Sequence, residues 1–357
     1  MIRTWVSVAA AALALAACGD GGAAKKTGAA ASGAPQVWAA GSSTVFPFAT
    51  RVAENVARTT GRPAGKVEAL GTGGGIKLFC GGQGNAFPDV ATASRQMKKS
   101  EFEQCAANGV ANIIELKIGY DGLVVAHDIA DPTFDMKLED LYRGLAAELP
   151  AEGGAFAKNT AVNWSDVRAG LPASRIVVYG PPPTSGTRDS FVELGMEGGA
   201  SKLPAMKALK ASNEDEFKAK AHALRTDGAW IDAGENDNAV VQTLTKTPGA
   251  LGAFGYSFLD NNRDKVKAVK LDGVEPTLTT IADGSYPLAR SLFIYVKKDR
   301  MAVVPGLKPY VDAFISDAAA GTGGYLQERG LVPLPKAEHD AQKAVAAAGT
   351  VMTAPAS

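Results

Sequence analysis

Short apolar segments alternate with amphipathic segments along the first third of the chain. The pattern predicts strands at residues 37–40, 66–70 and 90–93, and helices at 47–59 and 99–107. Parallel strands need long crossover connections, and a helix usually supplies them. This order of elements therefore predicts an α/β fold with a largely parallel sheet covered by helices.

The same features recur farther along the chain. Two separate strands are expected at residues 112–116 and 122–127, and a charge-rich helical stretch at 202–225. The unbroken apolar run LFIYV at 292–296 is typical of a buried strand. At 357 residues the chain is longer than a single core usually grows, so two domains are expected.

Three strand-to-helix turns are rich in glycine and hydroxyl side chains, at residues 41–44 (GSST), 71–75 (GTGGG) and 185–188 (SGTR). Ser and Thr cap helices, and glycine lets backbone N–H groups point at a ligand. Helix N-termini attract anions because their first N–H groups are unpaired. Capping alone would explain one such turn, whereas three of them predict a site for a tetrahedral oxyanion. The spacing matches neither a Walker loop nor a dinucleotide fingerprint.

The third turn follows a run of three prolines at 181–183, which would hold the chain extended. Ser185 and Thr187 supply hydroxyl groups, and Gly186 lets the backbone approach a ligand closely. Arg188 adds a planar fork of donors that matches an oxyanion.

Charge and residue spacing exclude several classes of protein. Lys and Arg number 37 against 37 Asp and Glu, so no nucleic-acid partner is indicated. His127, His222 and His339 are expected to be exposed or structural, and no metal or other cofactor is expected because ligand spacing is absent. Ser43 and Ser185 are candidate nucleophiles, but neither lies in a Gly-x-Ser-x-Gly elbow, and no His stands in a partnering motif. An enzyme is therefore not expected.

Residues 1–18 have the features of an export signal. Arg3 gives a positive start, and the apolar stretch that follows is too short to span a bilayer. The stretch ends in Leu-Ala-Ala-Cys, which looks like a lipobox, so Cys18 is expected to carry a lipid anchor. An ordinary cleaved secretory signal is the alternative. Residues 19–35 are rich in Gly, Ala, Ser and Lys, as a flexible tether would be.

Export also bears on the two remaining cysteines, Cys80 and Cys105. An oxidising compartment permits a disulfide, and with Cys18 lipidated these two form an even pair. A disulfide is therefore expected between the helix after the second turn and the next helix.

Seven motifs between roughly residues 36 and 345 follow one another in an order that matches a known family. They are GSSTVFP at 41–47, GTGGGIK at 71–77, ASR at 93–95, SGTRDSF at 185–191, GENDN at 234–238, GAFGY at 252–256 and LFIYVK at 292–297. With these motifs the chain resembles the phosphate-binding proteins of bacterial ABC-type phosphate transporters, the PstS-like family of periplasmic binding proteins.

The resemblance implies a type II periplasmic binding protein, a two-domain α/β clamp with a mostly parallel sheet flanked by helices in each domain. It implies that inorganic phosphate is captured between the domains and passed to a membrane-embedded ABC permease. Domain I would comprise residues 36–126 and 284–345, domain II residues 127–283, and a frayed tail residues 346–357. The protein would be a periplasmic monomer, anchored to the inner or the outer membrane.

The resemblance also implies which residues bind phosphate. Carried over one by one, they are Ser43, Thr44, Thr72, Ser94, Arg95, Ser185, Gly186, Thr187 and Arg188.

Two departures from the family pattern concern the charges of the site. Some members place an Asp at the position of Arg95, where it accepts the proton of hydrogen phosphate. Members with an Arg and an Asp ahead of Ser-Gly-Thr have those positions filled here by Pro182 and Thr184. Asp189 is a candidate acceptor, or else a partner of Arg188.

An acidic acceptor is the physical means of preferring protonated phosphate over sulfate, because two acceptors that face each other are costly. With no acceptor at the family position, two alternatives stay open. One is a binding protein for another oxyanion, such as sulfate, molybdate, arsenate or a phosphonate. The other is a surface lipoprotein without a role in transport.

Overall fold

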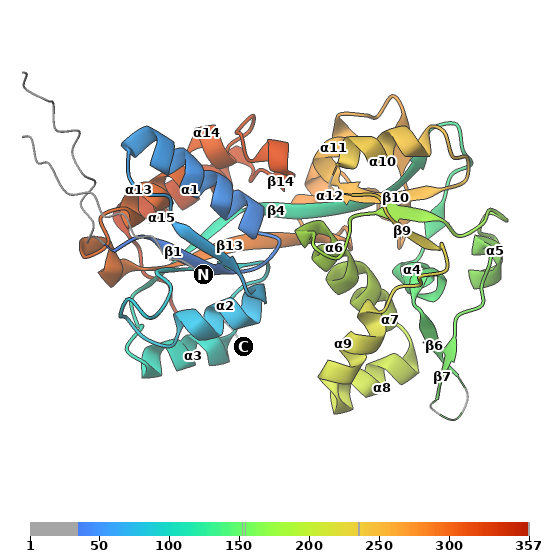
Figure 1. The fold of residues 1–357 in the computed structure, drawn as a ribbon, viewed down its shortest axis with the longest axis horizontal. Helices are drawn as coiled ribbons and strands as arrows, with labels where there is room; N and C mark the ends of the chain where they lie inside the picture. The colour runs from blue at the N-terminus through green and yellow to red at the C-terminus, as the bar shows by residue number, and fades with distance from the viewer. Residues whose placement is uncertain (1–34, 152, 154, 235, 356–357) are drawn as a thin grey trace, which may run out of the picture. The chain divides into compact units, whose positions relative to one another are not determined.

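The computed structural model describes residues 35–151, 153, 155–234 and 236–355 (Figure 1). The expected export signal, the anchor at Cys18 and the tether up to residue 34 lie outside the described residues. Within the described ranges, no helix has both the length and the apolar character needed to cross a bilayer.

The strands and helices follow the alternation that the sequence predicts. The strands are β1 (Trp38–Gly41), β2 (Lys66–Ala69), β3 (Val90–Ala93), β4 (Ile113–Asp128), β5 (Asp135–Met136), β6 (Glu148–Pro150), β7 (Phe156–Lys158), β8 (Val178–Gly180), β9 (Trp230–Asp232), β10 (Leu251–Gly255), β11 (Val266–Ala268), β12 (Lys270–Leu271), β13 (Ala289–Lys297) and β14 (Leu331–Val332). The helices are α1 (Phe46–Thr60), α2 (Gly71–Phe79), α3 (Lys99–Ala107), α4 (Leu138–Leu145), α5 (Trp164–Val167), α6 (Gly186–Ser190), α7 (Glu197–Ala200), α8 (Pro204–Ser212), α9 (Glu214–His222), α10 (Asp237–Leu244), α11 (Tyr256–Asp260), α12 (Leu278–Ala282), α13 (Leu307–Phe314), α14 (Asp317–Ala320) and α15 (Lys336–Ala348).

One mixed sheet organises the fold. Its strand order is β2-β1-β3-β13-β4-β10-β8-β9, and β11 and β14 also pair with β4. The pairs β1–β2, β1–β3, β10–β8 and β8–β9 are parallel, as predicted. Strands β4 and β13 are antiparallel to each other and to their other neighbours, β10 and β3. The protein is therefore of the expected α/β class, with two parallel sets of strands joined through an antiparallel pair.

Strand β4 is continuous where two strands were expected. A register shift opposite Leu292 and Phe293 of β13 absorbs the irregularity as a bulge. Gly119, in the middle of β4, has a φ of 154°, and a Cβ there would lie 2.8 Å from the carbonyl oxygen of Val332 in β14. The glycine at this position thus lets β14 approach β4.

The charge-rich stretch at 202–225 is helical, as expected, and forms the two helices α8 and α9. The side chain of Asn213 accepts the backbone N–H of Glu216 at 3.2 Å and so caps the start of α9. At the end of the chain, where a frayed tail was expected from residue 346, α15 continues to Ala348. Beyond it, the backbone N–H of Met352 donates to the carbonyl of Ile113 at 2.8 Å.

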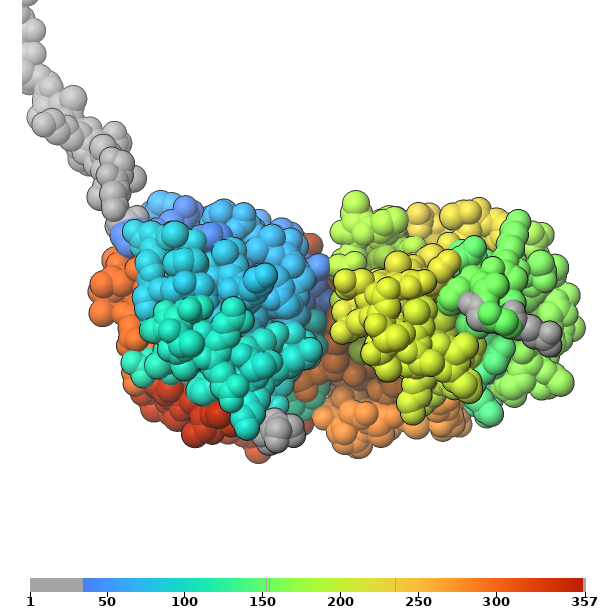
Figure 2. All heavy atoms as spheres, turned by 90° about the horizontal axis from the view of Figure 1, so that it is seen from below, coloured from blue at the N-terminus to red at the C-terminus, as the bar shows by residue number. Residues whose placement is uncertain are grey.

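The buried apolar side chains form three clusters. The largest draws its members from residues 120–288 and from Val332 and Leu334, whereas the other two draw theirs from residues 37–118 and 292–346. Figure 1 shows β4 and β13 running from one group of elements to the other, and Figure 2 shows a groove between the blue-to-teal and the yellow parts of the chain. The domain boundaries inferred from the sequence stay a prediction.

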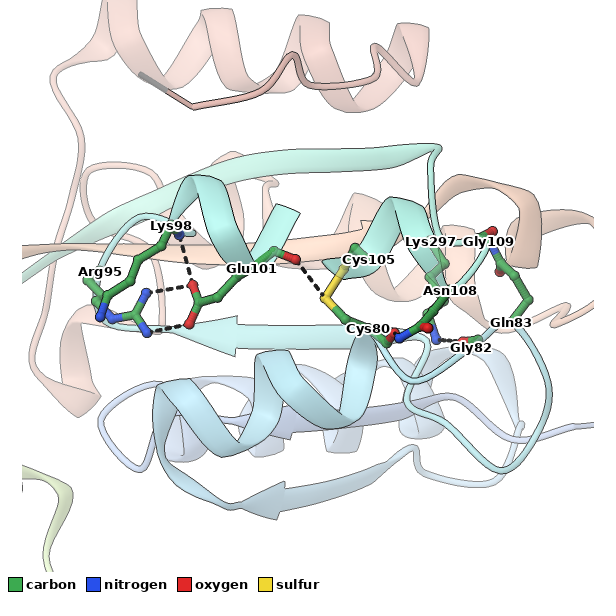
Figure 3. The surroundings of a disulfide bond; sticks show 10 residues. All are labelled: Cys80, Gly82, Gln83, Arg95, Lys98, Glu101, Cys105, Asn108, Gly109 and Lys297. Carbon is green, nitrogen blue, oxygen red and sulfur yellow. Dashed lines mark hydrogen bonds and ion pairs between the residues drawn. A yellow bond between two sulfur atoms is a disulfide. The ribbon is translucent and has the colours of Figure 1, made fainter. Parts of the chain in front are cut away.

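The expected disulfide is present between Cys80, directly after α2, and Cys105 in α3 (Figure 3). The two Cα atoms are 4.2 Å apart, and both cysteines are buried in the cluster that contains Ile76 and Phe79. The bond fixes the far end of α2, whose first turn is the second glycine-rich turn. The sequence-based prediction of this pairing is confirmed.

Removing this disulfide should lower the free energy of unfolding by about 2–4 kcal/mol, because the bond limits the freedom of the unfolded chain. The test is urea-induced unfolding of a variant carrying both Cys80→Ala and Cys105→Ala. Wild-type protein unfolded in a reducing agent is the control, since it loses the crosslink but keeps both sulfur atoms. A double variant as stable as the oxidised wild type would contradict this prediction.

Candidate functional site

The strand-to-helix turns lie at the carboxyl ends of parallel strands. β1 ends at Gly41 and runs parallel to β2 and β3, so the first turn, the start of α2 and Ser94 follow at the same edge. In the second parallel set, β8 ends at Gly180 and leads through the proline run into α6. Ligands of open α/β sheets bind outside the carboxyl ends of the strands, where helix N-termini offer N–H donors.

The first turn is held by Ser42 rather than by Ser43. The backbone N–H of Ser42 donates to the carbonyl of Thr92 at 2.9 Å, and its hydroxyl accepts the N–H of Val45 at 3.4 Å. In the described part of the chain, the backbone N–H groups of Ser43 and Thr44 have no hydrogen-bond partner. Two amide donors of this turn are therefore available to a ligand.

The second turn, which the sequence analysis placed ahead of a helix, is itself the first part of α2, because the helix begins at Gly71. A Cβ on Gly75 would lie 2.2 Å from the Cα of Gly41, so only glycine lets α2 approach β1 this closely. The hydroxyl of Thr72 accepts the backbone N–H of Ser94 at 3.1 Å, and their hydroxyl oxygens are 3.0 Å apart. Two of the predicted site residues thus contact each other.

The third turn begins α6. The Ser185 hydroxyl accepts the backbone N–H of Thr187 at 3.2 Å, which makes Ser185 the cap of the helix. A Cβ on Gly186 would lie 2.6 Å from the carbonyl oxygen of Ser43. The first and third turns therefore touch through their backbones, although they come from distant parts of the sequence.

The predicted cation Arg95 is engaged by a carboxylate. Its guanidinium donates to both oxygens of Glu101, at 2.9 and 2.7 Å (Figure 3). These hydrogen bonds raise the pKa of Arg95 above its usual value, against the effect of burial. The carboxylate of Glu101 therefore balances much of the positive charge of Arg95.

The second predicted cation, Arg188, is engaged in a similar way. Its Nη1 donates to Asp232 and to the carbonyl of Pro181, each at 3.2 Å, and its guanidinium lies 4.6 Å from the centre of the Trp230 ring. Burial lowers the pKa of Arg188 below its usual value, and Asp232 opposes that effect. The carboxylate that Arg188 contacts is thus Asp232 and not Asp189.

A third cation, Arg290 at the start of β13, lies where the first and third turns meet. Its Nη2 donates to the hydroxyl of Thr44 at 2.8 Å and to the hydroxyl of Ser190 at 2.9 Å. Its Nη1 forms an ion pair with Glu193. The Arg290 side chain is only 12% exposed, so its charge acts in a largely water-excluded place.

The carboxylate of Asp121 lies beside this guanidinium. Arg290 and Asp121 are cross-strand partners on β13 and β4, and Nε of Arg290 is 3.4 Å from the Asp121 carboxylate. The hydroxyl of Ser190 donates to Asp121 at 2.6 Å. One connected cluster therefore joins Thr44, Ser190, Arg290 and Asp121.

The sequence analysis missed Arg290 and Asp121. The available signal was a charged residue next to an apolar strand sequence. Asp121 lies between the two segments predicted as strands, and Arg290 lies just before the LFIYV run. A charge that interrupts a buried strand requires a partner. The partner could not be read from the sequence, because the two residues are far apart along the chain.

Other kinds of site find little support within the described ranges. No group of three or more His, Cys, Asp or Glu residues there could hold a metal ion. His127 and His339 are buried, and His222 contacts Glu197, so all three have structural surroundings.

Replacing Asp232 should destabilise the protein more than replacing Asp189. The Asp232 carboxylate forms an ion pair with Arg188 and accepts the indole N–H of Trp230 at 2.9 Å. Asp232→Asn removes the negative charge and so weakens both interactions. Because Asp232 is half exposed, we expect a loss of only about 0.5–1 kcal/mol. Urea-induced unfolding of Asp232→Asn beside its matched control Asp189→Asn measures the difference, and equal losses in both variants would contradict it.

Comparison with known proteins identifies the family. The model of the PBP superfamily domain matches residues 27–318. Protein SphX of Synechococcus elongatus is 32% identical over 305 residues, covering 84% of this chain and 77% of that protein. The phosphate-binding protein PstS of Staphylococcus saprophyticus is 29% identical over 342 residues, covering 93% and 90%. The crystal structure of a possible phosphate binding protein from Planctomyces limnophilus matches with a TM-score of 0.70 and 29% identity, covering 88% and 99%. The chain belongs to the PBP superfamily and, within it, to the PstS-like family.

Proposed function

We propose that this chain is an extracytoplasmic solute-binding protein that captures inorganic phosphate and delivers it to an ABC-type permease. The observation that carries the proposal is the contact of the first and third turns beside Arg290, with Gly186 against Ser43 and the guanidinium on Thr44. The Staphylococcus saprophyticus relative supports it, since that protein is named a phosphate-binding protein.

A dehydrated phosphate needs many donors in one place, and hydrogen bonds to charged groups contribute about 1.5–3 kcal/mol each. In the proposal, helix N-termini and hydroxyl groups supply neutral donors, while Arg290 supplies the main positive charge. Arg290 also pairs with carboxylates, Asp121 and Glu193. Unlike the other candidates for that charge, Arg95 and Arg188, it contacts the hydroxyl groups of Thr44 and Ser190 where the first and third turns meet. The proposed neutral donors are Ser43, Thr44, Thr72, Ser94, Ser185, Gly186 and Thr187.

The proposal keeps the cellular setting expected from the sequence. Cleavage before Cys18 and lipidation of that residue would hold the protein at a membrane, as a monomer that meets its permease there. Mass spectrometry of the protein from a membrane fraction tests the anchor, because a diacylglyceryl group adds a defined mass to the mature N-terminus.

Calorimetric titration of refolded, ligand-stripped protein with phosphate, sulfate and arsenate tests the proposed ligand. Phosphate should bind, and sulfate should bind far more weakly. Saturable binding of sulfate without binding of phosphate would contradict the proposal and favour the alternative of another oxyanion.

Gly186→Ala should weaken phosphate binding at least tenfold. The added Cβ would lie 2.6 Å from the Ser43 carbonyl oxygen, so the first and third turns would have to separate. Gly84→Ala is the matched control, because a Cβ at Gly84 has no atom within 4 Å. Calorimetry of both variants measures the effect, and unchanged affinity in Gly186→Ala would place the ligand elsewhere.

We also propose that the protein closes on its ligand by a hinge at β4 and β13. These strands connect the cluster of residues 120–288 with the clusters of residues 37–118 and 292–346. The two turns that touch each other precede helices of different clusters, so a ligand held by both would draw the clusters together.

Saturating phosphate should therefore reduce the radius of gyration measured by small-angle scattering. Arg290→Gln, which removes the proposed main charge, should show no compaction at the same phosphate concentration. If wild-type protein binds phosphate in calorimetry but its radius of gyration stays constant, the hinge proposal is wrong.

A further inference from the structure

We propose that the cavity behind strand β4 is a second binding site of this protein, which takes a small organic cation with an apolar body. The cavity has a volume of about 950 Å³, a size typical of pockets that hold small molecules. The inference goes beyond the proposed function, because it concerns another ligand and the other face of β4.

Strand β4 separates this cavity from the proposed phosphate site. Successive side chains of a strand point to opposite faces. Asp121 contacts Arg290 and Ser190 on one face, at 3.4 and 2.6 Å. Tyr120 and its cross-strand partner Val332 line the cavity on the other face. Asp121, Arg290 and the residues of the three turns, all within the described ranges, are not part of the cavity wall, so a ligand held there would not compete directly with phosphate.

The walls of the cavity come from two segments of the chain. α11 and α12 provide one wall, and residues from the stretch 322–338 provide the other. Figure 1 shows α11 and β14 beside β4. Leu278 of α12 is 51% exposed although it belongs to this concave wall, and the other wall contains Val332 and Leu334. An apolar body placed in the cavity would remove the exposed part of Leu278 from water, which is favourable.

The charged residues of the wall all have the same sign. Among the described residues that line the cavity they are Asp260, Asp283, Glu328 and Glu338, without Lys or Arg. Asp260 pairs with Arg263 at 2.9 Å, and Glu338 pairs with Lys117 at 2.8 Å. Asp283 and Glu328 have no ion-pair partner in the described part of the chain. A cationic group would therefore meet two carboxylates that no cation balances, whereas an anion such as phosphate would be repelled.

The cavity also spans the two parts of the protein that phosphate is proposed to draw together. α11 and α12 contribute Leu259 and Ile281 to the largest apolar cluster, whereas Leu326 in the other wall segment belongs to the cluster that contains α13. A rotation about β4 that narrows one side of the strand widens the other, so a filled cavity favours closure on the phosphate side. The two ligands should therefore raise each other's affinity by the same factor. This coupling rests on the proposed function, whereas the cavity site does not.

Tryptamine is the probe for the cavity, because it joins an apolar ring system to an ammonium group. Indole-3-propionate is the matched control, since it keeps the ring and the two-carbon chain but carries a carboxylate in place of the cation. Saturation-transfer NMR measures the binding of each compound to ligand-stripped wild-type protein. Tryptamine should bind saturably with a Kd of about 1 mM or lower, and indole-3-propionate should not bind.

Two variants test whether tryptamine lies in the cavity. Leu278→Ser removes the half-exposed apolar side chain, and the double variant Asp283→Asn with Glu328→Gln removes the two unbalanced charges. Each should weaken tryptamine binding about fivefold, because one loses apolar contact and the other loses charge attraction.

Each of these variants has a matched control outside the cavity. Val303→Ser removes an apolar side chain that is 52% exposed. Glu103→Gln with Asp215→Asn removes two exposed acids and so makes the same change of net charge. Both controls should bind tryptamine as wild-type protein does.

Calorimetric titration with phosphate, in the absence and in the presence of saturating tryptamine, tests the coupling. Wild-type protein should bind phosphate at least about fivefold more tightly when tryptamine is present. The double variant Asp283→Asn with Glu328→Gln should bind phosphate as wild-type protein does without tryptamine, and should show little gain at the same tryptamine concentration.

Absence of saturable tryptamine binding, or equal binding of indole-3-propionate, would overturn the assignment of the cavity. Tryptamine binding that survives unchanged in both cavity variants would also overturn it, because the probe would then lie elsewhere. If phosphate binds equally well with and without tryptamine, the coupling is wrong. Failure of wild-type protein to bind phosphate would instead overturn the proposed function, while the tryptamine titrations still decide whether the cavity is a site.

Discussion

The antiparallel pairing of β4 with β13 is the constraint on which the rest of the structure depends. The ladder runs from Lys297 opposite Ile113 to Ala289 opposite Gly122. The parallel set β2-β1-β3 joins it through β13, and the set β10-β8-β9 joins it through the other half of β4. Arg290 and Asp121 lie near the point where β4 passes from one set to the other. The charges of the proposed site are therefore fixed by main-chain hydrogen bonds rather than carried on loops.

The three arginines near the turns differ in what they contact. Arg95 pairs with the carboxylate of Glu101, and Arg188 pairs with that of Asp232. In the described part of the chain, Arg290 is the arginine of the three that also contacts hydroxyl groups of both the first turn and α6. Arg290 thus differs from the other two arginines in its position between the turns, and not in freedom from carboxylates, since it also pairs with Asp121 and Glu193.

Local features could be predicted from the sequence, and distant pairings could not. The bounds of β3 and α3 match their predictions because an apolar run and a helical pattern set them within a few residues. The disulfide followed from the parity of the cysteines. The prediction failed for β4, because residues 117–121 were placed between two strands, whereas the strand is continuous and Gly119 within it makes room for β14. It also missed the Arg290–Asp121 pair, since the cross-strand register that joins the two residues is a property of the folded sheet alone.

The strand order also determines when the sheet can be completed as the chain emerges with its N-terminus first. β13 lies between β3 and β4, yet it is synthesised after both and after the whole segment that forms the largest cluster. Until then β3, which is buried along its full length, has an unpaired edge that could pair wrongly with another chain. The segment 120–288 can fold within a nearly continuous stretch, whereas the N-terminal clusters must wait for the last part of the chain. The central strand of this sheet is thus added late in folding, and the Cys80–Cys105 bond, which lies entirely in the early segment, can hold α2 and α3 together before it arrives.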